Sequence, residues 1–224
     1  MAADKTIDIS EIFYSIIGEG PDTGRPAIFL RLAGCNFNCK FCDADCDSTM
    51  ETDTDTLASD LSRLMGENKC DALVITGGEP TLQVENLGLM LSKFIELAPS
   101  TRVIQVESNG YSFVDPEKGN RNFRWIGSLL LNKGFEFRYV ISPKFKESSY
   151  SEWMTFNRGM FYVKLLVESV ADLKDQLLKV KSLGFVGKVY VQPLDNSESL
   201  ARELIPELNG NILSMQVHKF IKVR

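Results

Sequence analysis

Three cysteines in one short stretch are the residues of this chain best suited to chemistry. Cys35, Cys39 and Cys42 are spaced CxxxCxxC, directly after an apolar run over residues 27–34 that predicts a buried strand. Thiolates at such spacing bind a metal ion or an iron–sulfur cluster, but a structural zinc site or a plain electron-transfer cluster normally takes four protein ligands. A site with three ligands keeps one metal position open, which indicates a catalytic role.

The other cysteines and the single histidine limit the alternatives. The chain has five cysteines, four of them within residues 35–46, which is a poor disulfide framework and favours a reducing compartment. A zinc site completed by Cys46 stays open, although we expect Cys46 to be a spare thiol and Cys70 to lie in the core. His218 is the only histidine and lies far along the chain, so a Cys/His zinc site would depend on this one residue.

Composition and charge describe an ordinary globular protein. Of 224 residues, 44% are hydrophobic and 25% are charged, and the net charge is −5. This negative charge argues against a nucleic-acid partner, since phosphate binding usually shows as a basic excess. The first residues lack the apolar segment of a signal peptide and no stretch approaches a membrane span, so we expect no membrane partner and a cytoplasmic location.

Apolar strands alternate with amphipathic helices along most of the chain. The expected strands are 27–33, 71–76, 102–107, 137–142, 161–167, 188–192 and 212–216. The expected helices are 55–66, 82–97, 169–183 and 197–208. We interpret 8–20 as an apolar beginning with a glycine turn, and 43–55 as irregular. Strands that are apolar on both faces and separated by helices predict a parallel α/β sheet, and without a linker we expect one domain over residues 1–224.

Polar and glycine-rich motifs follow six of these strands. They are the cysteine loop and the segments 76–80 (Thr-Gly-Gly-Glu-Pro), 107–110 (Glu-Ser-Asn-Gly), 142–144 (Ser-Pro-Lys), 192–193 (Gln-Pro) and 216–219 (Gln-Val-His-Lys). The carboxyl ends of parallel strands share one mouth, where ligands bind. We therefore expect the six motifs to converge on one site.

The cysteine loop followed by Gly77-Gly78-Glu79-Pro80 resembles the radical S-adenosylmethionine superfamily. In that superfamily the three cysteines hold a [4Fe–4S] cluster, and S-adenosylmethionine binds the open iron and is cleaved to a 5′-deoxyadenosyl radical. The resemblance implies that Cys35, Cys39 and Cys42 are the cluster ligands, and it accounts for the missing fourth thiolate.

A narrower resemblance covers nearly the whole chain. The segments 11–15 (Glu-Ile-Phe-Tyr-Ser), 18–20 (Gly-Glu-Gly), 29–35, 142–144 and 213–219 are similar to those of 7-carboxy-7-deazaguanine synthases. That family converts 6-carboxy-5,6,7,8-tetrahydropterin with loss of ammonia, on the way to 7-deazapurines such as queuosine. The resemblance implies an abridged parallel (β/α)6 partial barrel, a homodimer, Mg²⁺ dependence and a flavodoxin or ferredoxin type of reductant.

Two sets of residues match positions of that family. Those resembling the S-adenosylmethionine wall are Thr76, Gly77, Gly78, Glu79, Glu107, Ser108, Ser142, Lys144 and Gln192. Those matching the pterin site are Gly18, Glu19, Gly20, Arg31, Gln216 and His218. The guanidinium fork of Arg31 suits the substrate carboxylate. Glu107 is equally well explained as a cap of a neighbouring loop, and we interpret Lys164 as a snorkelling side chain outside the site.

The sequence departs from the family pattern at two positions. Ile17 stands where the family usually has glutamine, which predicts the loss or replacement of one hydrogen bond to the substrate. Ala44 stands two residues after Cys42, where the family has a Thr or Ser hydroxyl for Mg²⁺. Three alternatives stay open: Asp45, Asp47 or Ser48 replaces this ligand, substrate and water hold the ion, or Mg²⁺ is dispensable. We expect retained Mg²⁺ with weaker binding, and Asp45 as the candidate ligand.

Two other functions compete with a pterin-specific radical lyase. An activase that installs a glycyl radical on a partner enzyme also carries CxxxCxxC, but it has no need of the 18–20 and 213–219 motifs. A non-catalytic iron–sulfur or zinc module leaves the six converging motifs unexplained. A module does not cleave S-adenosylmethionine when reduced, and an activase cleaves it without responding to a pterin.

Overall fold

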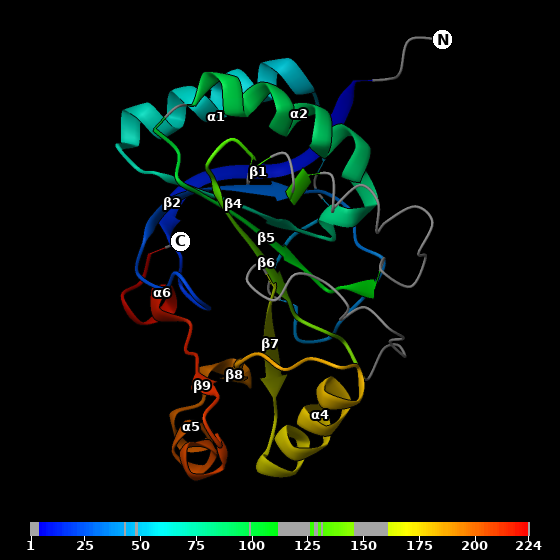
Figure 1. The fold of residues 1–224 in the computed structure, drawn as a ribbon, viewed down its shortest axis with the longest axis vertical. Helices are drawn as coiled ribbons and strands as arrows, with labels where there is room; N and C mark the ends of the chain where they lie inside the picture. The colour runs from blue at the N-terminus through cyan, green and yellow to red at the C-terminus, as the bar shows by residue number, and fades with distance from the viewer. Residues whose placement is uncertain are drawn as a thin grey trace.

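One mixed sheet organises the protein. The computed structural model describes residues 5–223, except 43, 48, 99, 112–125, 128, 129, 131 and 146–160. The described strands form a nine-stranded sheet in the order β3-β1-β2-β4-β5-β6-β7-β8-β9 (Figure 1). The strands are β1 (Thr6–Ile16), β2 (Pro26–Leu32), β3 (Met50–Asp53), β4 (Ala72–Gly77), β5 (Val103–Ser108), β6 (Glu136–Ile141), β7 (Phe161–Val167), β8 (Val189–Pro193) and β9 (Ile212–Leu213).

The sheet is mostly parallel and open. Each neighbouring pair from β2 to β9 is parallel, which confirms the fold class predicted from the alternation of strands and helices. β1 pairs antiparallel with β2, and β3 antiparallel with β1. β3 and β9 are the two ends of the order, so the sheet is not closed into a barrel.

Helices follow the parallel strands. They are α1 (Thr54–Asn68), α2 (Val84–Leu97), α4 (Val170–Ser182), α5 (Glu198–Leu204) and α6 (Val217–Phe220), with 3₁₀ turns η1 (Pro80–Gln83), η3 (Leu194–Asn196) and η4 (Ile205–Glu207). The α1 helix begins at Asp53, whose carboxylate accepts hydrogen bonds from the next turn, and α4 begins at Ser169 in the same way. None of the described helices is long and apolar enough to cross a membrane.

One face of the sheet packs against these helices. Leu61 and Met65 of α1, Phe94 of α2 and Leu173 of α4 belong to one buried cluster with the strands. Figure 1 shows α1 and α2 side by side over one end of the sheet, with α4 and α5 at the other end. Because side chains alternate along a strand, every second strand residue points away from this core.

The opposite face has an apolar floor and a polar upper part. Ile17 packs there with Ala27, Ala72, Val74 and Val103 in a small buried cluster. Further along the same face the strands carry buried polar side chains, which include Gln105, Lys164 and Gln192. Burying a polar group costs free energy unless it is hydrogen-bonded. Polar side chains at these positions therefore indicate a binding role for this face of the sheet.

Three strands differ from the sequence-based expectation. Residues 8–20 are mostly β1, in which a bulge between Ile9 and Glu11 interrupts the apolar alternation that identifies a strand. The segment 43–55, expected to be irregular, contains β3, whose exposed polar residues form an edge strand beside Thr6–Ile9. The expected strand 212–216 ends at Leu213, and the polypeptide then turns into α6.

Candidate functional site

A cavity of about 730 Å³ lies at the carboxyl ends of the parallel strands. This volume is typical of small-molecule sites. Its wall includes residues of all six motifs that follow the strands, which confirms that the motifs converge. Of the residues predicted for the site, only Glu79 and Gly20 do not line the cavity.

The cysteine loop forms one side of the cavity. Cys35, Cys39 and Cys42 line it and form no disulfide with another described residue, and the loop is held by hydrogen bonds to other segments. Gly34 donates its N–H to the carbonyl of Cys46 (2.9 Å) and accepts from the N–H of Glu79 (2.8 Å). The loop is therefore fixed at the end of β2 and next to the motif that follows β4.

Three of the thiols in the cavity wall keep the CxxxCxxC spacing of the loop. Among the described residues no group of three Cys, His, Asp or Glu side chains is gathered around one point. Cys46 also lines the cavity, and burial raises the pKa of its thiol to about 11.

Gly77 and Gly78 allow two backbone segments to touch. A Cβ on Gly78 would lie 1.7 Å from the carbonyl oxygen of Gly34, and a Cβ on Gly77 would lie 2.3 Å from the carbonyl oxygen of Leu32. These glycines bring the end of β4 against the end of β2 and the beginning of the cysteine loop.

Glu79 lies behind the wall and not in it. Its fully buried carboxylate accepts hydrogen bonds from the Ser108 hydroxyl (2.7 Å) and from the N–H groups of Asn109 (2.7 Å) and Thr81 (3.0 Å). Burial raises the pKa of Glu79, and these hydrogen bonds partly oppose the rise. The side chain joins the ends of β4 and β5, so any contact with a cofactor must come from the neighbouring backbone.

The remaining residues predicted for the cofactor wall do face the cavity. They are Thr76, Gly77, Gly78, Glu107, Ser108, Ser142, Lys144 and Gln192. Thr76 donates a hydrogen bond to Glu107 (3.2 Å), and Lys144 donates one to Ser142 (3.0 Å). Burial, aided by the charge of Lys164, lowers the pKa of Lys144 to about 8.

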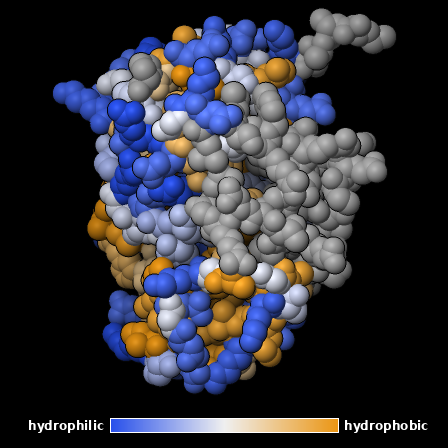
Figure 2. All heavy atoms as spheres, in the orientation of Figure 1, coloured by the Kyte–Doolittle hydropathy of each residue, from blue (hydrophilic) through white to orange (hydrophobic). Residues whose placement is uncertain are grey.

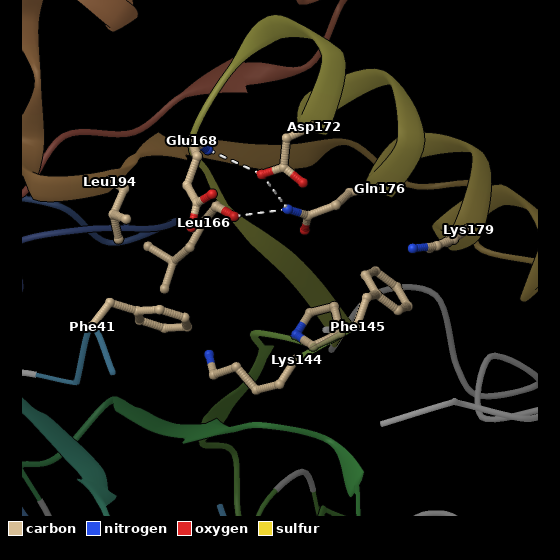
Figure 3. A pocket seen from close by; sticks show the side chains of 10 residues that line it. Phe41, Lys144, Phe145, Leu166, Glu168, Asp172, Gln176, Lys179 and Leu194 are labelled. Atoms are coloured by element: carbon tan, nitrogen blue, oxygen red, sulfur yellow. Dashed lines mark hydrogen bonds between the residues drawn. The ribbon is translucent and has the colours of Figure 1, made fainter. Parts of the chain in front are cut away.

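A small side pocket of about 40 Å³ opens beside the cavity (Figure 3). Phe41, Lys144, Leu166 and Leu194 line both spaces. On the far side Gln176 bridges the Leu166 carbonyl (2.8 Å) and the Asp172 carboxylate (3.0 Å). This pocket has room for little more than water, so the large cavity is the candidate site.

The Gly-Glu-Gly turn and the C-terminal tail form another side of the cavity. Val217 donates its N–H to the Gly18 carbonyl (2.9 Å), and Gly20 donates to the Ser214 hydroxyl (3.2 Å). A Cβ on Gly18 would lie 1.7 Å from Nδ1 of His218, so only glycine leaves room for the imidazole. Gln216 and His218 line the cavity beside this turn.

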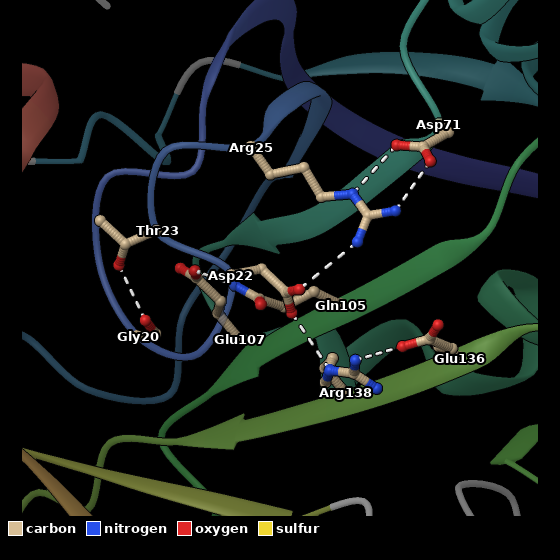
Figure 4. Close-up of polar contacts among 9 residues, drawn as sticks. All are labelled: Gly20, Asp22, Thr23, Arg25, Asp71, Gln105, Glu107, Glu136 and Arg138. Atoms are coloured by element: carbon tan, nitrogen blue, oxygen red, sulfur yellow. Dashed lines mark hydrogen bonds and ion pairs between the residues drawn. The ribbon is translucent and has the colours of Figure 1, made fainter.

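A network of ion pairs fixes the loop between β1 and β2, which carries Glu19 (Figure 4). Arg25 makes two hydrogen bonds to Asp71 (2.7 and 2.9 Å), and its guanidinium also lies 3.5 Å from Asp22. Asp22 pairs in turn with Arg138 of β6 (3.1 Å). The carboxylate of Glu19 is therefore presented to the cavity from a loop tied to β6 and to the residue that precedes β4.

Lys164 is the main site residue that sequence reasoning missed. It lines the cavity with only 7% of its surface exposed, and it forms an ion pair and hydrogen bond with Glu19. The prediction that Lys164 is a snorkelling side chain outside the site is wrong. The sequence feature that could have revealed it is a single charged residue inside the apolar strand Phe161–Val167. A buried ammonium group there needs a partner of opposite charge.

Lys164 stands between two carboxylates. Burial raises the pKa of Glu19, but the charge and hydrogen bond of Lys164 bring it below its ordinary value. Burial raises the pKa of Glu107, and Lys164 opposes this rise while the charge of Glu19 adds to it. Glu107 is thus a member of the site, although its hydrogen bonds to Thr76 and Gln105 also hold it in place.

The two departures from the family pattern lie in different surroundings. Ile17 is buried in the apolar floor with 1% exposure and does not line the cavity, so it fills space below the site. Ala44, Asp45 and Asp47 do line the cavity, and Asp45 accepts a hydrogen bond from the N–H of Asp47 (3.1 Å). Ser48 is outside the described residues.

Arg31 reaches the cavity from the end of β2. Its Nε donates to Glu11 (2.7 Å), and its guanidinium lies 5.7 Å from the centre of the Phe13 ring. Cys46 lies close enough for the charge of Arg31 to lower the pKa of its thiol slightly against the effect of burial. This places one arginine between the cysteine loop and β1.

Comparisons with known proteins agree with this geometry. Residues 16–157 match the family described as a 4Fe-4S single cluster domain. A 7-carboxy-7-deazaguanine synthase of Methanospirillum hungatei is 34% identical, over 98% of this chain and 87% of that protein. One of Hyperthermus butylicus is 29% identical, over 96% of this chain and 88% of that protein.

A solved structure shares the fold. The crystal structure of QueE from Escherichia coli superposes with a TM-score of 0.66 at 19% sequence identity, over 97% of this chain and 100% of that chain. The fold and the matches over nearly the full length of its relatives lead to one conclusion: the chain belongs to the 7-carboxy-7-deazaguanine synthase family.

Proposed function

We propose that this protein is a 7-carboxy-7-deazaguanine synthase, a radical S-adenosylmethionine lyase. It converts 6-carboxy-5,6,7,8-tetrahydropterin to 7-carboxy-7-deazaguanine with loss of ammonia. The observation that carries the proposal is that the three cysteines line the same cavity as Glu19, Arg31 and His218. One space thus combines a cluster site with groups suited to a polar heterocyclic carboxylate.

Cys35, Cys39 and Cys42 would hold the [4Fe–4S] cluster, because they are the thiols that line the cavity at the matched spacing. When bound, the cluster supplies the electron for reductive cleavage of S-adenosylmethionine. The wall from Thr76 to Gln192 would bind and orient that cofactor through hydroxyls, backbone groups and Lys144.

Other residues of the cavity would hold the substrate. Arg31 would pair with the substrate carboxylate, and Glu19 would accept hydrogen bonds from ring N–H groups, since both line the cavity. Gln216 and His218 would cover the substrate from the tail. These side chains position the substrate and exclude water around it, which is the part of radical chemistry that a protein supplies.

The direct test is product analysis after anaerobic reconstitution. The reduced protein is incubated with S-adenosylmethionine and carboxytetrahydropterin, and mass spectrometry should detect 7-carboxy-7-deazaguanine. Formation of 5′-deoxyadenosine without that product would contradict the substrate and leave the radical mechanism standing. Absence of both would contradict the enzyme class.

We infer that Mg²⁺ is retained and bound more weakly than in relatives with a hydroxyl at position 44. Activity should fall in EDTA-treated, metal-free buffer and return on adding Mg²⁺. Restoring a ligand oxygen with Ala44→Thr should lower the half-activating Mg²⁺ concentration by about tenfold, which corresponds to roughly 1.4 kcal/mol. Asp45→Asn should raise it, with Asp47→Asn as the matched control, and full activity without metal would rule out the dependence.

We expect Gly18→Ala to weaken substrate binding, since the added Cβ would collide with His218 and displace the tail. The KM for the pterin should rise roughly 10-fold or more, because a displaced charged or polar contact is worth about 1.5–3 kcal/mol. Gly66→Ala is the matched control, because this glycine lies in α1 with open space around its Cβ position. An unchanged KM for Gly18→Ala would show that the tail does not touch the substrate.

We also propose assignments for the domain, the location, the reductant and the oligomeric state. All described strands belong to one sheet, which supports a single domain and an abridged (β/α)6 partial barrel. Free cysteines support the reducing cytoplasm and an external reductant of the flavodoxin or ferredoxin type. Figure 2 shows apolar residues among hydrophilic ones over the end with α4 and α5, and exposed Leu178, Ile205 and Phe220 support a homodimer.

A further inference from the structure

Lys164 is a buried cation that the fold alone does not explain. It lies in β7 on the cavity side, with Tyr162 and Leu166 as the next residues on the same face. Its ammonium pairs with Glu19 from the β1–β2 loop and lies near Glu107 from β5. Replacing a buried ion pair with apolar side chains is often neutral or stabilising, so this cluster is not the obvious choice for stability.

The ion pair uses only one oxygen of Glu19. Oε1 accepts from Lys164, whereas Oε2 is buried and has no hydrogen-bond partner among the described residues. The amide oxygen of Gln192 is also buried without a partner in the described part of the chain. Glu19 and Gln192 both line the cavity. Buried acceptors normally have a donor, so a ligand that brings N–H groups to Glu19 would fill its second oxygen.

The amino-pyrimidinone ring of a pterin has such donors. Its amino group and ring N–H lie on one edge, and a carboxylate accepts from both more strongly than a neutral group does. This requires Glu19 to stay charged and to keep its carboxylate at the cavity wall. In a buried site, a cation beside the carboxylate favours its charged form and holds it in place.

We propose that Lys164 is the positioning residue that keeps the Glu19 carboxylate charged and turned toward the N–H edge of the pterin. This inference rests on the proposed function, because it takes the pterin as the ligand. Lys164 acts through Glu19 and need not touch the substrate. The proposal explains how the buried Glu19 carboxylate can stay charged and accept hydrogen bonds from the N–H groups of a pterin.

Other charged groups face this cluster and bear on its pH dependence. Glu107 comes from β5, Lys144 from the segment after β6, and His218 from α6. Tyr190 of β8 is the neighbour of Lys164 across the strand pair. Lys144 and His218 add positive charge, but Lys164 is the group in direct contact with Glu19.

The test measures binding of 6-carboxypterin, an oxidised and fluorescent substrate analogue, to the cluster-loaded protein with S-adenosylmethionine and no reductant. Lys164→Met and Lys164→Gln should weaken binding roughly 30-fold, the range expected for a lost charged hydrogen bond. Lys164→Arg keeps the charge and should recover most of the affinity. Binding of S-adenosylmethionine should not change, which separates positioning of the substrate from a general loss of structure.

A double-mutant comparison shows whether Lys164 acts through Glu19. Adding Lys164→Met to Glu19→Gln should weaken binding less than twofold further, since the group that Lys164 controls is already gone. Adding Lys164→Met to Glu107→Gln, which removes the charge of the other carboxylate near Lys164, should still weaken binding of 6-carboxypterin roughly 30-fold. Full additivity with Glu19→Gln, or loss of additivity with Glu107→Gln instead, would overturn the proposal.

The pH profile gives a second readout. Without the cation, burial raises the pKa of Glu19, so Lys164→Met should bind poorly at low pH and regain affinity as the pH rises. The unchanged protein should keep its affinity over the same range. If Lys164→Met and Lys164→Gln both fail to load a cluster, Lys164 serves the fold and the inference is wrong.

Different results would contradict the proposed function and the proposed role of Lys164. If the unchanged protein forms no product from carboxytetrahydropterin, the proposed function fails whatever the variants do. If it forms product and Lys164→Met binds 6-carboxypterin as tightly as the unchanged protein, only the role of Lys164 is refuted.

Discussion

Cys39→Ser should abolish reductive cleavage of S-adenosylmethionine, with a loss of more than roughly 1,000-fold, since the reaction has no other route for the electron. Cys39 lines the cavity between Cys35 and Cys42, and a serine hydroxyl is a poor ligand for iron in a cluster. The measurements are 5′-deoxyadenosine formation and the iron content and visible absorbance after anaerobic reconstitution. All three should fall together.

Cys46→Ser is the matched control for this loss. Cys46 lies in the same cavity wall, four residues after Cys42, but outside the CxxxCxxC spacing. The variant should load a complete cluster and cleave S-adenosylmethionine at the ordinary rate. A loss of cluster in Cys46→Ser equal to that in Cys39→Ser would point to four thiolate ligands and a site without an open position.

Gly78→Ala should have the largest effect on stability among the single methyl additions considered. The new Cβ would lie 1.7 Å from the Gly34 carbonyl oxygen and 3.0 Å from the backbone nitrogen of Cys35. Both atoms belong to the backbone and cannot turn away as a flexible side chain could. We expect the free energy of unfolding to fall by about 3 kcal/mol, the upper part of the range for overpacking.

Urea denaturation of the cluster-free protein checks this value, and reconstitution shows whether Cys35 still binds iron. Gly66→Ala adds the same methyl group to α1, where nothing lies near, and should be neutral or stabilise by roughly 0.5–1 kcal/mol. If Gly78→Ala unfolds at the same urea concentration as the unchanged protein and loads a full cluster, the close contact with Gly34 does not matter.

The parallel core of the fold was predictable because its signals are local. Apolar runs such as Phe161–Val167 end at polar motifs, and helices such as α4 begin at a capping serine. β3 was not predictable, because Met50–Asp53 is short, polar and exposed, and is a strand only through its pairing with β1. Edge strands of this kind depend on contacts that the sequence does not display.

The site was predictable at residues whose type and spacing are specific to one kind of chemistry. The cysteines and the Gly-Glu-Gly turn carry their chemistry in their spacing. Lys164 was missed because a lysine within a strand has two explanations, and only the ion pair with Glu19 decides between them. For Glu79 the motif located the right segment, but the direction of the side chain depends on Ser108 and Asn109 of the next strand.

The contact between the Gly-Glu-Gly turn and the tail has a consequence for the order in which the protein folds. Gly20 and Ser214 are joined by a hydrogen bond although they lie 194 positions apart in the chain. Contacts of such long range form late, since the intervening chain must first be ordered. On the ribosome the cysteine loop is complete long before residues 214–218 are made. A nascent chain therefore has its thiols while the substrate end of the cavity is still missing, and a chain that stops short of the tail keeps its cysteine loop and loses this end of the cavity.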